Sequence, residues 1–250
     1  MTIQGLLFDK DGTLISFTPL WPAIARDCAC QLVASGNVEC DVTVDRLLAA
    51  IGVQGESIDP QGILAVEPVS ATAAAWYALL QPAIPAAAFA QQVSHMMQRS
   101  LYAHPQWLAA IADVPAQLRL WRAQGYRLGV ATADNQDSTR FCLAHTGLLE
   151  LFDFIGTSDG ELAAKPDPAL LHAFCNETGL RPQQVIMFGD TPSDMAFGRN
   201  AGAFSVGVLS GTATSAELAP LAHGIVPSVA DFDPARLPWS LQTEGAYQHG

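Results

Sequence analysis

Five short apolar runs, each shorter than a typical helix, determine the fold class expected for this 250-residue chain. The later runs alternate with segments of helical length and pattern, and a continuous apolar run is typical of a strand buried on both faces of a parallel sheet. The alternation predicts an α/β fold built on a doubly wound parallel sheet with right-handed crossovers. The predicted strands are Gly5–Phe8, Arg127–Ala131, Phe152–Ile155, Val185–Phe188 and Phe204–Val208, and the predicted helices are Pro115–Gln124, Ser138–His145, Pro168–Thr178 and Ser193–Ala201.

The interval between the first two strands is too long for a single crossover. From Ser16 to about Ala103 the pattern is helical, with Ala-rich and Leu-rich faces and no convincing strand. We therefore predict an α/β core formed by residues 1–15 and 104–250, with a helical unit, residues 16–103, inserted into it. The last part of the core, residues 226–250, is rich in proline and polar residues and is expected to be a loosely held tail.

Composition and charge exclude several classes of protein. Half of the residues are apolar and 14% are charged, which is the composition of a chain with a sizeable core and not of a disordered one. The net charge of −12 argues against a nucleic-acid partner.

Residues 68–98 carry no charge, but Pro82 and Pro85 interrupt them, so an unbroken apolar span of about 20 residues is missing. With no signal-peptide pattern after Met1, we expect a cytoplasmic protein without a membrane partner.

The first chemical signal is the hexapeptide Asp9-Lys10-Asp11-Gly12-Thr13-Leu14, which directly follows the first predicted strand. Two carboxylates this close together repel each other, and a bound divalent cation removes the conflict because hard cations take carboxylate oxygens. Gly12 permits a turn that brings backbone N–H groups towards a phosphate. The alternative is a strand that simply ends in an Asp-Gly turn.

Three further elements come after other predicted strands. Thr132 offers a hydroxyl to a phosphate oxygen or, alternatively, only caps the next segment of the chain. Lys165 lies in the loop before a predicted helix, where it is either a cation that meets a phosphate or an ordinary surface lysine. Asp190 and Asp194 add carboxylates after the fourth strand, although Asp194 could equally be a first-turn acid of the next helix. A parallel sheet gathers all of these positions at the rim where such sheets bind ligands.

Taken together, the four elements resemble the motifs of the haloacid-dehalogenase-like superfamily. The matching positions are Asp9–Leu14, Thr132, Lys165 and Gly189–Asp194, and the resemblance covers roughly residues 1–15 and 104–226. The inserted unit is similar to the helical cap of that superfamily, and the layout is similar to its phosphoglycolate-phosphatase-like branch. The pair Thr132-Ala133 departs from the Thr-Asn common in that branch, which removes a side-chain donor that would help to define the substrate.

The resemblance implies a Mg²⁺-dependent phosphatase that hydrolyses a small phosphorylated metabolite, phosphoglycolate-like or a sugar phosphate, through an aspartyl-phosphate. In this interpretation Asp9 is the nucleophile, and Asp11 protonates the leaving group and later activates water. Thr132 and Lys165 hold the phosphoryl oxygens. The implied Mg²⁺ ligands are Asp9, the backbone carbonyl of Asp11, and Asp190, with Asp194 supporting them from behind.

Other activities of the superfamily, and a non-catalytic role, are the alternatives. A phosphomutase differs mainly in excluding water from the phosphoenzyme, so the sequence leaves it open. Carbon–halogen hydrolysis needs no second carboxylate, and Asp11 therefore speaks against it. The phosphonate-cleaving branch relies on a cap lysine, and residues 16–103 contain none. A binding protein that has kept only the fold would normally have lost a nucleophile or a metal ligand. The sequence does not specify an oligomeric state.

Overall fold

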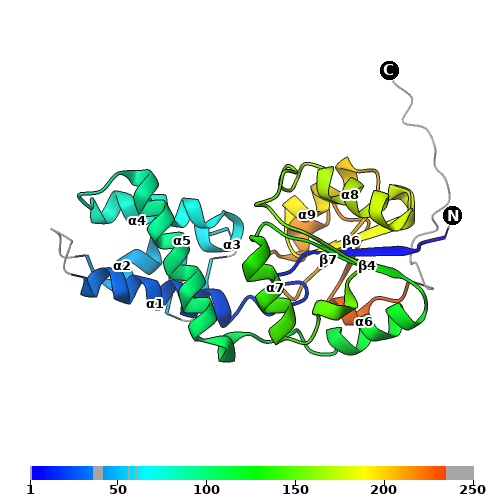
Figure 1. Ribbon diagram of the computed structural model, residues 1–250, viewed down its shortest axis with the longest axis horizontal. Helices are drawn as coiled ribbons and strands as arrows, with labels where there is room; N and C mark the ends of the chain where they lie inside the picture. The colour runs from blue at the N-terminus through cyan, green and yellow to red at the C-terminus, as the bar shows by residue number, and fades with distance from the viewer. Residues whose placement is uncertain (1, 36–41, 56, 60, 235–250) are drawn as a thin grey trace, which may run out of the picture.

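The computed structural model describes residues 2–35, 42–55, 57–59 and 61–234 (Figure 1). Within them, a six-stranded sheet has the spatial order β5-β4-β1-β6-β7-β8, and every neighbouring pair of strands is parallel. The predicted fold class is therefore confirmed. The strands are β1 (Gly5–Phe8), β4 (Arg127–Ala131), β5 (Phe154–Gly156), β6 (Val185–Gly189), β7 (Phe204–Val208) and β8 (Gly224–Val226).

The strand order changes direction at β1. From β1 the chain proceeds outward through β4 and β5, then returns to the other side of β1 and continues through β6, β7 and β8. Phe8, the last residue of β1, pairs with Val130 on one side and with Phe188 on the other. In open α/β sheets the crevice at such a switch point, beyond the carboxyl ends of the strands, is where ligands bind.

Helices cover both faces of the sheet, as alternating side chains along the strands require. Leu7 of β1 packs in one cluster with Phe174 and Phe197, whereas Phe8 belongs to the cluster on the opposite face with Trp121. Figure 1 accordingly shows α8 and α9 on one side of the sheet and α6 on the other. The core helices are α6 (Val114–Ala123), α7 (Gln136–His145), α8 (Ala169–Thr178), α9 (Pro192–Asn200) and α10 (Ser215–Leu218), with 3₁₀ turns at Pro105–Trp107, Leu149–Leu151, Pro182–Gln184 and Val229–Asp231.

A helical unit lies at one end of the sheet and belongs to the chain between β1 and β4 (Figure 1). Trp76 is fully buried in it and donates its indole N–H to the carbonyl of Leu47 at 2.9 Å. The unit also holds a two-stranded antiparallel hairpin, which the sequence did not indicate because each strand has two residues. Its elements are α1 (Leu20–Ala34), α2 (Val44–Ala49), β2 (Val53–Gln54), β3 (Ser57–Ile58), α3 (Ile63–Val66), α4 (Val69–Leu80) and α5 (Ala86–Ala103).

The uncharged stretch over residues 68–98 contains α4 and most of α5. Among the residues that the structure describes, no helix has both the length and the apolar character needed to cross a membrane.

The two segments that connect the helical unit to the sheet lie side by side. Ser16 N–H donates to the carbonyl of Ala109 at 2.9 Å, and Ile111 N–H donates to that of Leu14 at 3.0 Å. These bonds anchor the entry and the exit of the unit next to the hexapeptide that comes after β1. The helical unit is therefore attached directly above the switch point.

Besides shifts of helix ends and the unpredicted α10, the structure differs from the sequence prediction in the core at β5, at β8 and in the expected tail. β5 begins two residues later than expected, because Leu149–Leu151 forms a 3₁₀ turn that ends at Phe152. β8 was not predicted, since a three-residue apolar segment carries too little pattern. Residues 226–234, expected to belong to a loose tail, are packed: Val226 ends β8, and Phe232 lies edge-on to Phe188 with ring centroids 5.0 Å apart. Residues 235–250 lie outside the described residues.

Candidate active site

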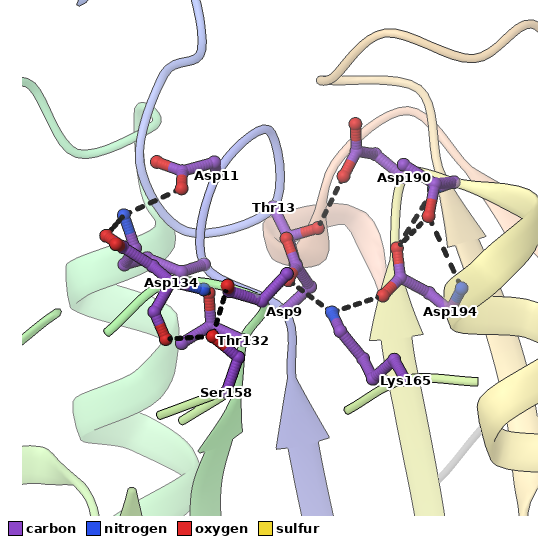
Figure 2. A network of polar contacts seen from close by, with 12 residues as sticks. Asp9, Asp11, Thr13, Thr132, Asp134, Ser158, Lys165, Asp190 and Asp194 are labelled. Carbon is purple, nitrogen blue, oxygen red and sulfur yellow. Dashed lines mark hydrogen bonds and ion pairs between the residues drawn. The ribbon is translucent and has the colours of Figure 1, made fainter. Parts of the chain in front are cut away.

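Asp9 is the first residue after the central strand and stands at the middle of the candidate site (Figure 2). Its N–H donates to the carbonyl of Phe188 at 2.8 Å, which continues the ladder between β1 and β6 and fixes the backbone. The side chain is buried, and Oδ1 accepts a hydrogen bond from Nζ of Lys165 at 2.5 Å. Burial raises the pKa of Asp9 to about 7, while the ammonium group of Lys165 acts in the opposite direction.

Two more carboxylates meet Asp9 from the segment after β6, Asp190 directly after the strand and Asp194 in the first turn of α9. Oxygens of Asp9, Asp190 and Asp194 all lie within 4.8 Å of one another, and all three residues are buried. Burial, and next the negative charges of Asp9 and Asp194, raise the pKa of Asp190 well above its usual range. Three buried like charges around one point repel each other strongly unless a cation joins them. The donors are all oxygen, so this cluster fits a hard divalent cation such as Mg²⁺.

The orientation of Asp190 is set by a loop that the sequence analysis did not single out. Oδ2 accepts from the N–H of Thr212 at 2.9 Å and from its hydroxyl at 3.3 Å, and Thr13 Oγ1 lies 3.5 Å from Oδ1. Gly211 makes this approach possible, because a Cβ at that position would lie 1.9 Å from Asp190 Oδ2. The loop 210–212 after β7 therefore holds one member of the acidic cluster in place.

Gly12 also approaches the carboxylate of Asp190 closely, next to Gly211. Its φ is +80°, and a Cβ there would lie 2.5 Å from Asp190 Oδ2. The carbonyl of Gly12 accepts from the hydroxyl of Ser210 at 2.7 Å, so the loop after β1 is tied to the loop after β7. Glycine is thus required both for the turn and for the close approach of the two loops.

Lys165 and Asp194 complete the side of the site next to β6. Lys165 Nζ contacts Asp194 Oδ1 at 2.6 Å in addition to Asp9, and burial, which by itself lowers the pKa of Lys165, is outweighed by these two carboxylates, which raise it. Asp194 is also the N3 residue of a capping box with Thr191. Asp194 is therefore the first-turn acid of α9 that the alternative interpretation predicted, and its other carboxyl oxygen pairs with Lys165.

The carboxylate of Asp11 lies away from this acidic cluster, on the other side of Asp9 (Figure 2). Its Oδ2 is 2.7 Å from Nζ of Lys10, and the same ammonium group lies 3.2 Å from Oδ2 of Asp134. Lys10 is completely buried. The sequence analysis assigned no role to Lys10 or Asp134. The position of Lys10 between two aspartates was the one feature of the sequence that could have indicated a role for it.

Thr132 lies on the same side of Asp9 as Asp11 and is buried (Figure 2). Its Oγ1 accepts from the N–H of Asp134 at 3.2 Å, and its own N–H donates to the carbonyl of Gly156 at 3.0 Å. The capping role falls to Asn135, whose side chain accepts from the N–H of Ser138 at 2.9 Å. Ser158 steadies the turn from the loop after β5 by donating to the carbonyl of Ala133 at 2.6 Å.

The structure thus brings all six predicted side chains to one rim, in two groups around Asp9. Lys165, Asp190 and Asp194 lie on the β6 side, and Asp11 and Thr132 lie on the β4 side (Figure 2). A buried carboxylate paired with a lysine, beside a cluster of carboxylate oxygens that could hold a metal ion, at the switch point of a parallel sheet, is typical of hydrolytic and phosphoryl-transfer enzymes.

The family is established by comparison with known proteins. The chain matches the haloacid dehalogenase-like hydrolase family over residues 3–202, and it belongs to that family. The match begins before β1 and extends beyond α9, so it includes all six predicted site residues, whereas the loop 210–212 lies beyond it.

Individual relatives carry several activities in their names. The chain is 33% identical over 105 residues to pyrophosphatase PpaX of Bacillus velezensis, a match that covers 42% of this chain and 49% of that protein. It is 29% identical over 222 residues to a phosphonoacetaldehyde hydrolase of Bacillus cereus, covering 85% and 78%. It is 29% identical over 201 residues to a phosphoglycolate phosphatase of Cereibacter sphaeroides, covering 80% and 82%. In the matches of highest significance the chain spans about half the length of the curated relative.

A solved structure agrees with the fold. The crystal structure of a predicted phosphoglycolate phosphatase from Haemophilus somnus superimposes with a TM-score of 0.71 at 20% identity, and the alignment covers 92% of this chain and 96% of that one. At this identity the likeness shows the fold alone.

Proposed function

We propose that the protein is a Mg²⁺-dependent phosphatase that hydrolyses a small phosphomonoester through an aspartyl-phosphate on Asp9. The observation that carries the proposal is the position of Asp9, buried at the switch point between a lysine and two further carboxylates. The carboxylate is oriented and ion-paired, as a nucleophile in covalent catalysis needs to be.

The two halves of the reaction use Asp9 and Asp11 in turn. An oxygen of Asp9 attacks phosphorus, the bond to the leaving oxygen breaks, and Asp11 supplies the proton that this oxygen takes up. In the second half Asp11 removes a proton from water, the water oxygen attacks the phosphorus, and the Asp9 carboxylate is released. Thr132 and Lys165 lie on opposite sides of Asp9 and are suited to hold the phosphoryl oxygens.

The metal would be held by Asp9, Asp190 and the backbone carbonyl of Asp11. When bound, Mg²⁺ supplies positive charge that offsets the negative charge developing on the phosphoryl oxygens. Asp194 is occupied by Lys165 and by the capping box, so it supports the ligands from behind. Two side-chain carboxylates and one carbonyl make a sparse ligand set, which suits Mg²⁺ because that ion keeps several of its waters.

We also propose that the helical unit, residues 16–103, is a cap over the site and that residues 1–15 and 104–250 form the catalytic core. Gln61 in the loop before α3 donates to Glu217 of α10 at 2.7 Å, and this contact supports the idea because it joins the unit to the core on the side of the Thr212 loop. The names of the relatives, phosphoglycolate phosphatase and pyrophosphatase, describe small phosphorylated substrates. A cap that closes over the rim would expel water and favour substrates of that size.

Two other activities remain to be compared with this proposal. A phosphomutase uses the same groups and differs in how far water is excluded, so product analysis separates the two. Phosphonate cleavage is named for one relative. The proposal disfavours it here because the sequence has two lysines, Lys10 and Lys165, and neither belongs to residues 16–103.

The decisive experiment is phosphate release from a panel of two- to six-carbon phosphate esters with Mg²⁺, ranked by kcat/KM. Acid quenching during a single turnover, followed by mass spectrometry, should show a phosphoryl group on the peptide that contains Asp9 and so identify the nucleophile. Release of the leaving group with no phosphoryl group found on that peptide at any quench time would overturn the covalent mechanism. Isomerised sugar phosphate without phosphate release would identify a mutase.

A further inference from the structure

Lys10 and Lys165 are the only lysines in the sequence, and both lie in the candidate site. Each bridges one carboxylate from the segment after β1 and one aspartate from another loop. Lys165 contacts Asp9 and Asp194, and Lys10 contacts Asp11 and Asp134. The proposed function gives Lys165 a direct role but leaves the second, equally buried, lysine unexplained.

Lys10 does not reach the substrate. Its side chain has no exposed surface, whereas that of Asp11 is 19% exposed. Above the ammonium group lies the ring of Trp21 from α1, with its centroid 5.6 Å from Nζ. A lysine that is enclosed in this way affects chemistry only through the groups that it contacts, so its influence passes through Asp11.

The two carboxyl oxygens of Asp11 have different environments. Oδ2 is held by Lys10 at 2.7 Å, whereas Oδ1 is buried and accepts no hydrogen bond from any described residue. The side chain is therefore anchored by one oxygen, whereas the other is not tied to any described residue. Asp134 fixes the position of the lysine in turn, and its own backbone N–H donates to Thr132.

This arrangement answers a problem posed by the hexapeptide. Asp9 and Asp11 are two positions apart, and a cation bound by Asp9 and Asp190 would also attract the carboxylate of Asp11. A fixed ammonium group on the β4 side gives Asp11 an alternative partner and keeps its carboxylate away from the acidic cluster.

We propose that Lys10, anchored by Asp134, is a positioning residue that holds Asp11 on the leaving-group side of Asp9, so that Asp11 acts as the proton donor and is not drawn in as a further side-chain metal ligand. The inference rests on the role that the proposed function gives to Asp11. It assigns a purpose to the ion pairs of Lys10 with Asp11 and Asp134, which the proposed mechanism alone leaves unexplained.

The test compares two substrates that differ in how much they need a proton. p-Nitrophenyl phosphate has a leaving group that departs without protonation, whereas an alkyl phosphate such as β-glycerol phosphate does not. The rate of leaving-group release in a single turnover isolates phosphorylation of Asp9, since the later hydrolysis step is common to both. We expect Lys10→Met to slow release of the leaving group from the alkyl phosphate at least about tenfold more than from the aryl phosphate. A positioned acid–base group contributes roughly 10²–10⁴-fold to the rate, so partial loss of its position can account for a difference of this size.

Lys165→Met is the matched control, because it removes the only other lysine. Lys165 faces the group that both substrates share, so this variant should slow both by a similar factor. Lys10→Met leaves the carboxylates of Asp11 and Asp134 without their shared cation, which could destabilise the fold. The double variant Lys10→Met with Asp134→Asn removes one of these two charges. It should show the same difference between the two substrates. Circular dichroism and thermal unfolding establish that each variant is folded.

Asp11→Asn separates failure of this inference from failure of the proposed function. If Asp11→Asn slows the two substrates equally, the proposed role of Asp11 is wrong and the role of Lys10 falls with it. If Asp11→Asn shows the difference between substrates but folded Lys10→Met and the double variant slow both substrates equally, or slow neither, only the role of Lys10 is overturned.

Discussion

Lys165 Nζ donates a hydrogen bond to Asp9 Oδ1 at 2.5 Å, across 156 positions of the sequence. The contact joins the loop beyond β5 to the end of the central strand and sets the charge state of the proposed nucleophile. Burial raises the pKa of Asp9 to about 7, and the lysine opposes that rise. Because the pKa of about 7 already includes the opposing effect of Lys165, loss of this lysine would leave Asp9 still more protonated at neutral pH and a poorer nucleophile.

Replacing the nucleophile tests the proposed mechanism most directly. We expect Asp9→Asn to abolish turnover, because an amide does not attack phosphorus, and to leave the fold intact. Thermal stability in metal-free buffer should stay the same or increase, since one of three buried like charges is removed. Phosphate release and a thermal melt measure the two effects.

The matched control is Asp45→Asn, at a carboxylate that is 89% exposed and pairs with Arg26 in the helical unit. It should retain wild-type turnover. More than about a hundredth of wild-type kcat in Asp9→Asn, prepared free of host phosphatase, would falsify the assignment of the nucleophile.

Metal dependence should be visible without any turnover. Mg²⁺ bound by Asp9, Asp190 and the Asp11 carbonyl stabilises the native state alone, by about 2.7 kcal/mol at a hundred times its Kd. We therefore expect Mg²⁺ to raise the Tm of the wild-type protein and EDTA to reverse the rise. Activity should be lost with EDTA, and Ca²⁺ should bind but support turnover poorly because its larger shell alters the attacking geometry.

Asp190→Asn provides the comparison for the metal site. It removes one proposed ligand charge, so the Mg²⁺-induced rise in Tm should shrink or disappear, while Asp45→Asn should respond like the wild type. An equal rise in all three proteins would place the metal elsewhere, and full activity in metal-free buffer would show that no metal is needed.

Much of the site could be predicted because parallel strands end at one rim. Asp9, Thr132 and Asp190 each come within a residue of the end of an apolar run, and the sheet aligns those ends. Their proximity is therefore a consequence of the strand assignments alone. Lys165 could be included because its loop comes after another strand of the same sheet.

The remaining contacts depend on side-chain geometry that no sequence period encodes. Lys10 meets Asp134 only because β1 and β4 are neighbours in register and Asp134 turns inward after Thr132. Gly211 and Thr212 lie after β7 in a segment without any motif, and their role appears only when Asp190 is placed against them. The three residues of β8 and the two-residue strands of the hairpin are stabilised by their neighbours and not by their own pattern.

Adding a methyl group at Gly211 should weaken the metal site without touching a proposed ligand. A Cβ there would lie 1.9 Å from Asp190 Oδ2, so Gly211→Ala must displace the carboxylate or the loop. We expect the Mg²⁺ concentration that gives half-maximal activity to increase about 10–100-fold, which is typical when a residue that orients a metal ligand is changed. The Mg²⁺ concentration that gives half of the rise in Tm should increase by a similar factor.

Gly160→Ala is the control for this prediction. The nearest atom to a Cβ at Gly160 is the carbonyl oxygen of Thr157 at 3.8 Å, an ordinary contact. This variant should keep the wild-type Mg²⁺ dependence. Unchanged Mg²⁺ affinity in folded Gly211→Ala would mean that the loop after β7 does not determine the position of Asp190.

The size of the substrate should be limited by the helical unit. Its two connections, joined by the Ser16–Ala109 and Ile111–Leu14 hydrogen bonds, leave the core beside the hexapeptide that contains Asp9 and Asp11. If the unit is the proposed cap, attachment at that point and the contact of Gln61 with Glu217 of α10 would restrict the space above the rim. The net charge of −12 also disfavours long polyanions. We expect two- to six-carbon phosphate esters to be hydrolysed with much higher kcat/KM than phosphopeptides or oligonucleotide 5′-phosphates. Equal or better turnover of either macromolecular substrate, measured with the same preparation and with Asp9→Asn as the blank, would contradict the proposed cap.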